Sequence, residues 1–291
     1  MIPLAHIEQW AANAPWPDPR QVEQDAIICR ALCDLFSHPL LRQTLAFRGG
    51  TAIHKLLFPQ PLRYSEDIDL VQVAPGPIGN VIDAIRDSLS WLGRCKRDQT
   101  PLTTKLVYRF PAEEGGGSLK LKIEINTREH QSRHGLKTYP FSMAGDWHEG
   151  QAAVVSYEPE EIFGTKLRAF LQRNKNRDLF DLSQGLQQLN LDRGRLIDCF
   201  VHSTAGEGRP ISRAAAEERV LGKLSRSLTE DVAPLLPAGV TFTHSAAIDA
   251  VGRIWSELIT GLPGESWQSS ATVIDRIRAE QEPRFLKGFN P

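Results

Sequence analysis

The sequence has 291 residues, of which 41% are hydrophobic and 24% charged, and its net charge is −1. This composition is typical of a globular protein and excludes a general polyanion binder, so any nucleic-acid contact must come from local basic patches. No apolar run approaches the length of a membrane span, and the N-terminus has no basic region followed by an apolar stretch. We therefore expect a cytoplasmic protein with no membrane segment, long enough for two domains.

The predicted elements of the first half mix helices with strands. Residues 22–36 form an amphipathic helix, on which Cys29 and Cys33 lie four residues apart, as expected of reduced core thiols rather than a disulfide or zinc site. A glycine turn then opens a helical segment over residues 51–58, and alternation predicts a strand over residues 64–73. A helix over residues 78–92 and strands over residues 102–110 and 119–126 follow. Together they predict an α/β fold, a small mixed sheet with flanking helices.

The second half of the chain has almost only helical patterns, interrupted at residues 206–210 and 234–239. A break near residues 150–159 is the candidate domain boundary. We therefore expect a catalytic domain with an N-terminal helical arm over residues 1–155. A mostly helical domain over residues 156–291 is expected to complete the active site, which would lie between the two.

Two acids two residues apart, Asp67 and Asp69, are the most informative pattern in the chain. Side chains two apart on a strand share a face, so both carboxylates and Ser65 point the same way. Two neighbouring carboxylates repel each other unless a positive charge lies between them. Hard oxygen ligands at this spacing suit Mg²⁺, which takes one or two carboxylates together with substrate phosphates.

The glycine turn that precedes these acids, Gly49-Gly50-Thr51, opens a helix whose free amides and positive end would hold a phosphate. By itself such a turn is usually only a turn, and a lone D-x-D is usually a solvated strand end. In this order, with a short helix between them, a phosphate site followed by a metal-binding acid pair indicates nucleotidyl transfer.

Residues 119–126 alternate with period two, so Lys122 and Glu124 share one face. A strand of this kind beside the acid pair would supply Glu124 as the third carboxylate that two metal ions about 4 Å apart require. The alternative is a solvated sheet face, on which Glu124 pairs with Lys122 or Lys120.

Lys166 lies within or beside the apolar stripe of a helix over residues 158–173. Buried lysines are rare unless they are paired, so its ammonium is expected to face the triphosphate, with snorkelling to solvent as the alternative. Asn176 is expected to cap the next helix and to place Asp178 in its first turn, which is sufficient cause for an acid there. Asp181 lies deeper and would orient Lys166 or pair with Arg177.

A basic cluster surrounds this corner of the chain. Such clusters are usually solvated faces, but beside a nucleotide site this one would hold phosphates of a nucleotide or of RNA. Its members are Arg168, Arg173, Lys175 and Arg177.

The chain resembles the AbiEii/AbiGii toxin family of nucleotidyltransferases, in the DNA polymerase β-like superfamily. Five ordered motifs carry the resemblance: R-G-G-T-A-I-H-K-L from Arg48, R-Y-S-E-D-I-D-L from Arg63, K-I-E-I from Lys122, G-T-K-L-R-A-F from Gly164 and R-D-L-F-D-L from Arg177. They cover about half of the chain, and the last 100 or so residues match only as a helical tail. The resemblance implies a nucleotidyltransferase fold, a nucleoside triphosphate donor, Mg²⁺ and a separate antitoxin. In some members it implies the 3′ end of tRNA as the acceptor.

The resemblance also implies roles by position. Asp67 and Asp69 are metal ligands with Glu124 as the third, and Lys166 and Asp181 join them as catalytic residues. The expected nucleotide-binding residues are Arg48, Gly49, Gly50, Thr51, Lys55, Ser65 and Lys166.

The function expected from residues and resemblance together is that of a toxin that transfers NMP from an NTP to an acceptor hydroxyl, blocking translation. Two alternatives keep the same donor site, a small-molecule transferase of the antibiotic-modifying kind and a protein-modifying transferase. A third alternative is a non-enzymatic nucleotide-binding scaffold for an antitoxin.

Overall fold

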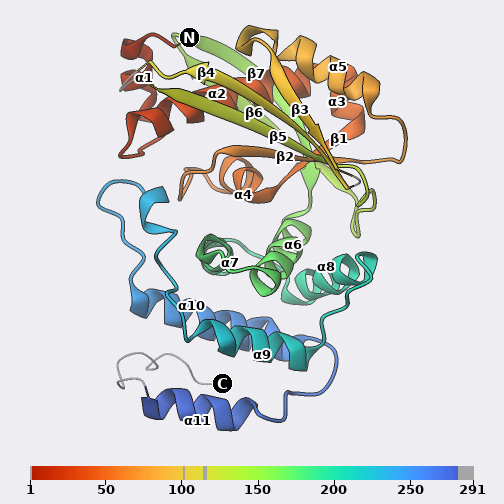
Figure 1. The fold of residues 1–291 in the computed structure, drawn as a ribbon, viewed down its shortest axis with the longest axis vertical. Coiled ribbons are helices and arrows are strands. Elements are labelled where there is room, and N and C mark those ends of the chain that lie inside the picture. Colours follow the sequence, from red (N-terminus) through yellow and green to blue (C-terminus); the bar gives the residue numbers. More distant parts are fainter. Residues whose placement is uncertain (1, 101, 114–116, 281–291) are drawn as a thin grey trace. The chain divides into compact units, whose positions relative to one another are not determined.

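The computed structural model describes residues 2–100, 102–113 and 117–280 (Figure 1). The chain forms two compact units. One contains the residues up to Glu158 together with Leu235–Gly239, and the other contains the remainder of the described chain. The stretch from Gly150 to Tyr157, expected as part of a break between domains, instead lies in a strand.

A seven-stranded mixed sheet forms the centre of the first unit, in the order β3-β4-β5-β2-β1-β7-β6. Strand β2 runs parallel to β5 and β1 parallel to β7, while the other neighbours are antiparallel. This confirms the mixed α/β fold. The strands are β1 (Leu45–Arg48), β2 (Asp67–Gln72), β3 (Cys95–Gln99), β4 (Thr103–Pro111), β5 (Ser118–Asn126), β6 (Leu136–Gly145) and β7 (His148–Tyr157).

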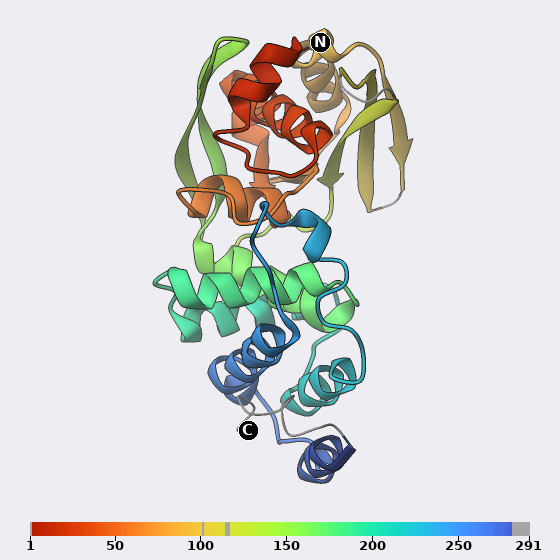
Figure 2. The same ribbon diagram turned by 90° about the vertical axis from the view of Figure 1, so that its left-hand side faces the viewer.

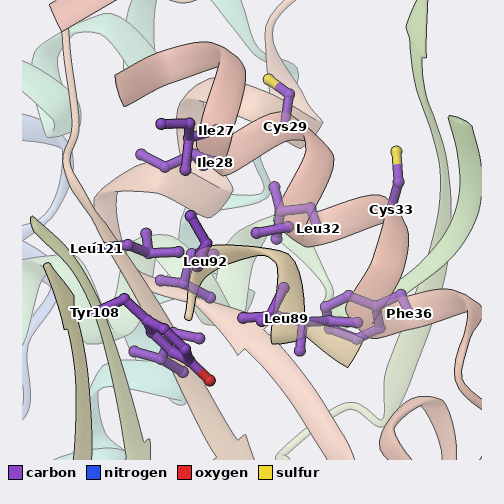
Figure 3. Close-up of a cluster of buried hydrophobic side chains, with 14 of the residues drawn as sticks. Ile27, Ile28, Cys29, Leu32, Cys33, Phe36, Leu89, Leu92, Tyr108 and Leu121 are labelled. Carbon is purple, nitrogen blue, oxygen red and sulfur yellow. The ribbon is translucent and has the colours of Figure 1, made fainter. Parts of the chain in front are cut away.

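Helices of the first unit pack against the sheet, and α2 supplies much of the core. The helix begins with Pro19 at its first position, and Asp18 caps it by accepting a hydrogen bond from the Arg20 amide. Its buried side chains meet those of η2 and of strands β4 and β5 (Figure 3). These helices are α1 (Leu4–Trp10), α2 (Pro19–Ser37), α3 (Pro39–Thr44), α4 (Gly49–Ala52), the π-helical η1 (Ile53–Leu57), α5 (Gly79–Ser88) and the 3₁₀ turn η2 (Ser90–Leu92).

The second unit is helical, as expected from the sequence. Helices α6, α7 and α8, coloured green to teal, lie side by side in both views (Figure 2). Gly164 permits the close approach of α6 to α8, because a Cβ there would lie 2.8 Å from the Cβ of Cys199. The helices are α6 (Pro159–Gln172), α7 (Asn176–Gln188), α8 (Arg193–Gly206), α9 (Arg213–Lys223), α10 (His244–Glu257) and α11 (Ser270–Glu280). The short 3₁₀ turns are η3 (Ala233–Leu235) and η4 (Ile259–Gly261).

Several local expectations can be compared with these elements. Cys29 and Cys33 are buried and unpaired in the first unit, which confirms that they are reduced core thiols. The helix expected from Thr51 begins at Gly49 and continues as a π-helix, and the residue that caps α7 is Lys175 rather than Asn176. Within the described parts of the chain, no helix has the length and apolar character needed to cross a membrane.

Candidate active site

The three acidic residues singled out from the sequence share one face of the sheet. Asp69 lies opposite Glu124 in the parallel register of β2 and β5, and Asp67 lies opposite Lys122. Along β2, Asp67 and Asp69 are partly exposed while Ile68 and Leu70 are buried. The shared face is therefore confirmed, and strand pairing brings the backbone of Glu124 beside that of Asp69.

Lysines also lie on this face of the sheet. The Nζ of Lys122 is 2.8 Å from Oδ2 of Asp67 and 3.5 Å from Oε2 of Glu124, and the Nζ of Lys105 lies 3.5 Å from the same Glu124 oxygen. The pairing of Glu124 with Lys122, which the sequence left open, is thus present. Within the described ranges, no group of three or more His, Cys, Asp or Glu side chains is gathered as a metal site.

Asp69 differs from the other two acids in its electrostatic environment. Burial disfavours its charged form and Asp67 repels it, so the pKa of the Asp69 carboxyl is raised above its ordinary value, although Arg48 and Lys122 act in the opposite direction. An acid held in this way gains most from a cation that binds beside it.

The glycine turn packs directly against the acid-bearing strand. Gly49 has a φ of +84°, and a Cβ there would lie only 2.2 Å from Oδ2 of Asp69. A Cβ on Gly50 would lie 2.5 Å from Nη2 of Arg63. Glycine is therefore required at Gly49 for two reasons, a left-handed backbone conformation and contact with the acid.

Thr51 joins the turn to β2 through its hydroxyl. Its Oγ1 donates to the backbone oxygen of Asp67 at 2.5 Å and lies 2.7 Å from Oγ of Ser65. Both predicted residues thus lie beside the first acid, and the hydroxyl pair fixes the start of the helix relative to the strand.

Arg48, at the end of β1, lies opposite Asp69 in the antiparallel register with β2. Its guanidinium donates to the carboxylate of Glu129, with which it forms a salt bridge. Burial acts to lower the pKa of Arg48, but the charge and hydrogen bond of Glu129, together with Tyr157 and Asp69, outweigh that effect and raise it. Glu129 was not identified from the sequence, where it lies in an irregular segment without periodicity.

Lys55 lies in a buried ion pair, although the sequence grouped it with the nucleotide turn. Its Nζ donates to both oxygens of Asp25, at 2.8 and 2.7 Å. The indoles of Trp10 and Trp16 donate to the same carboxylate, at 3.0 and 3.2 Å. Asp25 was not identified from the sequence. Its place among the apolar residues of α2 was a signal, because a buried acid needs a positively charged or hydrogen-bonding partner.

Lys166 is buried and paired with two acids of α7. Its Nζ lies 3.1 Å from Oδ1 of Asp178 and 3.0 Å from Oδ2 of Asp181, and both acids are fully buried. The sequence left two roles open for Asp181, to orient Lys166 or to pair with Arg177. The structure shows the contact with Lys166. Asp178 lies in the first turn of α7, as expected. The helix end is not the only group that stabilises its carboxylate, because Arg173 also donates to it, at 2.7 and 2.8 Å.

The basic residues near α7 have different surroundings and do not form one solvated face. Arg168 is only 9% exposed, pairs with Glu207 and donates to the backbone oxygen of Ser203. Lys175 is exposed and Arg177 half-buried. The cluster predicted from spacing is thus divided between buried ion pairs and solvent-facing cations.

Comparisons with known proteins show the family to which the chain belongs. The family model described as the nucleotidyl transferase AbiEii toxin of a type IV toxin–antitoxin system matches residues 30–253. MenT4, a nucleotidyltransferase toxin from Mycobacterium tuberculosis H37Rv, is similar in structure, with a TM-score of 0.65 and 18% identity over 100% of both chains. JHP933 from Helicobacter pylori matches with a TM-score of 0.49 and 15% identity, over 91% of this chain and 99% of that chain. A search of curated proteins found no match.

Proposed function

The chain belongs to the AbiEii family of nucleotidyltransferase toxins of type IV toxin–antitoxin systems, and on that premise we propose a specific reaction for it. It transfers a nucleoside monophosphate from a nucleoside triphosphate to the 3′ hydroxyl of an RNA, with tRNA as the acceptor, and thereby blocks translation. The family implies an antitoxin partner. Free nucleotides and tRNA both occur in the cytoplasm, where we place the reaction.

The observation that carries the proposal is the placement of Asp69 opposite Glu124, with the Gly49 turn against the same strand. Three carboxylates on two adjacent strands are the ligand chemistry that Mg²⁺ takes in phosphoryl-transfer sites. Lys122 and Lys105 pair with Asp67 and Glu124, and a metal ion would have to replace these contacts when it binds the carboxylates. We propose Asp67, Asp69 and Glu124 as the residues that hold the metal.

The bound metal would supply charge neutralisation at the donor's phosphates, which is the largest requirement of phosphoryl transfer. The other roles fall to groups of this chain. The amides of Gly50 and Thr51 open a helix and would hold a terminal phosphate, and Arg48 would add a positive charge beside Asp69. One of the three carboxylates would accept the proton of the attacking hydroxyl.

For Lys55 and Ser65 we propose roles within the nucleotide turn itself. The buried pair of Lys55 with Asp25 supports a role in holding the helix that follows the glycines, rather than direct contact with phosphate. Ser65 shares a hydroxyl contact with Thr51 and would fix the turn. Lys166 and Asp181 belong to the second unit, and the family resemblance is what supports a catalytic role for them.

Four cations remain as the proposed RNA-binding set. Lys175 is exposed and suited to direct phosphate contact, and the half-buried Arg177 is proposed to contact phosphate beside it. The Arg173 side chain is 49% exposed even though it pairs with Asp178, so it can also reach a ligand. Arg168 is held by Glu207 and would support the others from within the unit.

A labelling experiment tests the acceptor. The purified protein is incubated with each NTP labelled at the α-phosphate, Mg²⁺ and total RNA together with cell protein, and the products are separated. Label on a band of tRNA size is the expected result, and periodate treatment of the RNA beforehand should abolish it by destroying the 3′ diol. Label on a polypeptide or on a small molecule would replace RNA with one of those acceptors.

A further inference from the structure

A cavity of about 310 Å³ opens in the second unit between two segments that are distant in the sequence. One wall is the connection that leads into α7, and the other is the stretch that follows α9. The lining residues are Asn174, Lys175, Asn176, Lys223, Arg226, Ser227, Leu228, Glu230 and Asp231.

Three cations line this cavity: Lys175, Lys223 and Arg226. None of them forms a salt bridge within the part of the chain that the structure describes, although two carboxylates line the same cavity. One of these carboxylates, Asp231, accepts a hydrogen bond through its Oδ1 from the backbone amide of Asn176 at 3.1 Å. The lining thus carries three cations and two carboxylates, and an anion bound among the cations would offset the positive charge that remains.

Hydrogen bonds across the cavity hold its walls in place. The Nζ of Lys223 donates to the backbone oxygen of Arg173 at 2.7 Å and to Oδ1 of Asn174 at 3.2 Å. The side-chain Nδ2 of Asn176 donates to the backbone oxygen of Ser227 at 3.1 Å. The two segments are therefore joined before any ligand binds, and a preformed site costs less ordering on binding.

The like charges also act on each other. Burial, together with the nearby charges of Arg226 and Arg219, lowers the pKa of the Lys223 ammonium, although Asp178 acts in the opposite direction. A phosphate in the cavity would relieve this repulsion and restore the favourable environment of the charged form.

We propose that this cavity binds a backbone phosphate of the RNA acceptor, through Lys175, Lys223 and Arg226. The proposal rests on the proposed function, because it assumes an RNA acceptor. The volume exceeds that of a single phosphate group and leaves room for the attached ribose.

The test compares a cavity variant with a matched control. Lys175→Gln with Arg226→Gln removes two charges from the cavity and leaves the hydrogen bonds of Lys223 intact. Arg195→Gln with Arg276→Gln removes two exposed charges from the same unit, at positions outside the cavity. Binding of fluorescein-labelled total tRNA to each protein is measured by anisotropy over a series of salt concentrations, without NTP.

The expected result for the cavity variant is a loss of at least fivefold in tRNA affinity. The slope of log affinity against log salt should also fall by about 0.7, since the cavity holds one phosphate and each phosphate contact to a single strand contributes about 0.7. The control should bind like wild type. An equal loss of tRNA affinity in the control, or no loss in the cavity variant at any salt concentration, would overturn the proposal that the cavity binds RNA. The proposed function would still stand. A wild-type protein that binds no tRNA would overturn both.

Discussion

Asp69 on β2 lies opposite Glu124 on β5, and a Cβ placed on Gly49 would come within 2.2 Å of the Asp69 carboxylate. One residue thus joins the parallel strand pair to the glycine turn. A change at Asp69 should affect the metal-binding face and the turn together.

The raised pKa of Asp69 predicts how its replacement changes stability with pH. Its folded pKa lies above the ordinary value of 3.8, so the folded state binds the proton more tightly than the unfolded chain. The favourable contribution of Asp69 to the free energy of unfolding is therefore fully present below pH 3.8, and it is lost as the pH rises through the folded pKa. Asp69→Asn removes the charge that desolvation and Asp67 disfavour, and it should raise the free energy of unfolding at pH 7. That gain over wild type should shrink as the pH falls toward 3.8, which urea unfolding at several pH values measures.

The same urea unfolding measurements can also contradict this prediction. If Asp69→Asn destabilises the protein at pH 7, the carboxylate is stabilised by its neighbours rather than strained by burial. Asp87→Asn, at an exposed acid of α5, serves as the control and should change stability little at any pH.

Gly49→Ala should destabilise the protein and weaken binding of nucleotide. The backbone there has a positive φ, and the added methyl group would collide with Asp69, so we expect a cost of about 1–3 kcal/mol. Gly206→Ala is the matched control, because Gly206 ends α8 with nothing within 4 Å of an added Cβ. Chemical unfolding and nucleotide titration of both variants give the comparison, and equal stability of the two would show that the turn tolerates a side chain.

The sequence predicted the faces of the site, because period two fixes which side chains share a side of a strand. It therefore placed Asp67 with Asp69, and Lys122 with Glu124, before any pairing was known. The strand register that sets Asp69 opposite Glu124 depends on contacts between residues 55 positions apart, and local periodicity contains no information about them.

Four strands, β1, β3, β6 and β7, were not predicted from the sequence, and β6 shows one physical reason. β6 is an edge strand, exposed on most of its length, and Pro140 lies within it, so neither alternation nor β-propensity marks it as a strand. The acidic partners of the two buried lysines, Asp25 and Asp178, were also not identified from the sequence. Spacing on a helix showed that Lys166 lies in an apolar stripe, but it could not show that Asp178 and Asp181 both meet it.

Lys166→Met should destabilise the second unit by about 3–5 kcal/mol, since it leaves two buried carboxylates without their shared cation. Adding Asp181→Leu should recover part of the loss, because Asp178 keeps its pair with Arg173. Urea unfolding of the single and double variants measures this coupling. A single variant as stable as wild type would mean that the buried acids do not need the ammonium.

Lys55→Met should be costly in the first unit for the same reason. It leaves the buried Asp25 carboxylate with only its neutral donors, including the two indoles, and the expected loss is again about 3–5 kcal/mol. Lys137→Met makes the same change at an exposed pair with Glu158 and should cost at most about 1 kcal/mol. Thermal unfolding of both variants distinguishes the two environments, and similar losses would contradict the structural role assigned to Asp25.

The central claim is that the acids of β2 hold the metal for nucleotidyl transfer, and labelled donor tests it most directly. Wild type, Asp67→Asn and Asp69→Asn are each incubated with tRNA, Mg²⁺ and NTP labelled at either the α- or the γ-phosphate. We predict that wild type transfers the α-label and not the γ-label, and that each variant loses transfer by at least about 10²–10³-fold while remaining folded. Transfer of the γ-label, or full activity in either variant, would contradict the account.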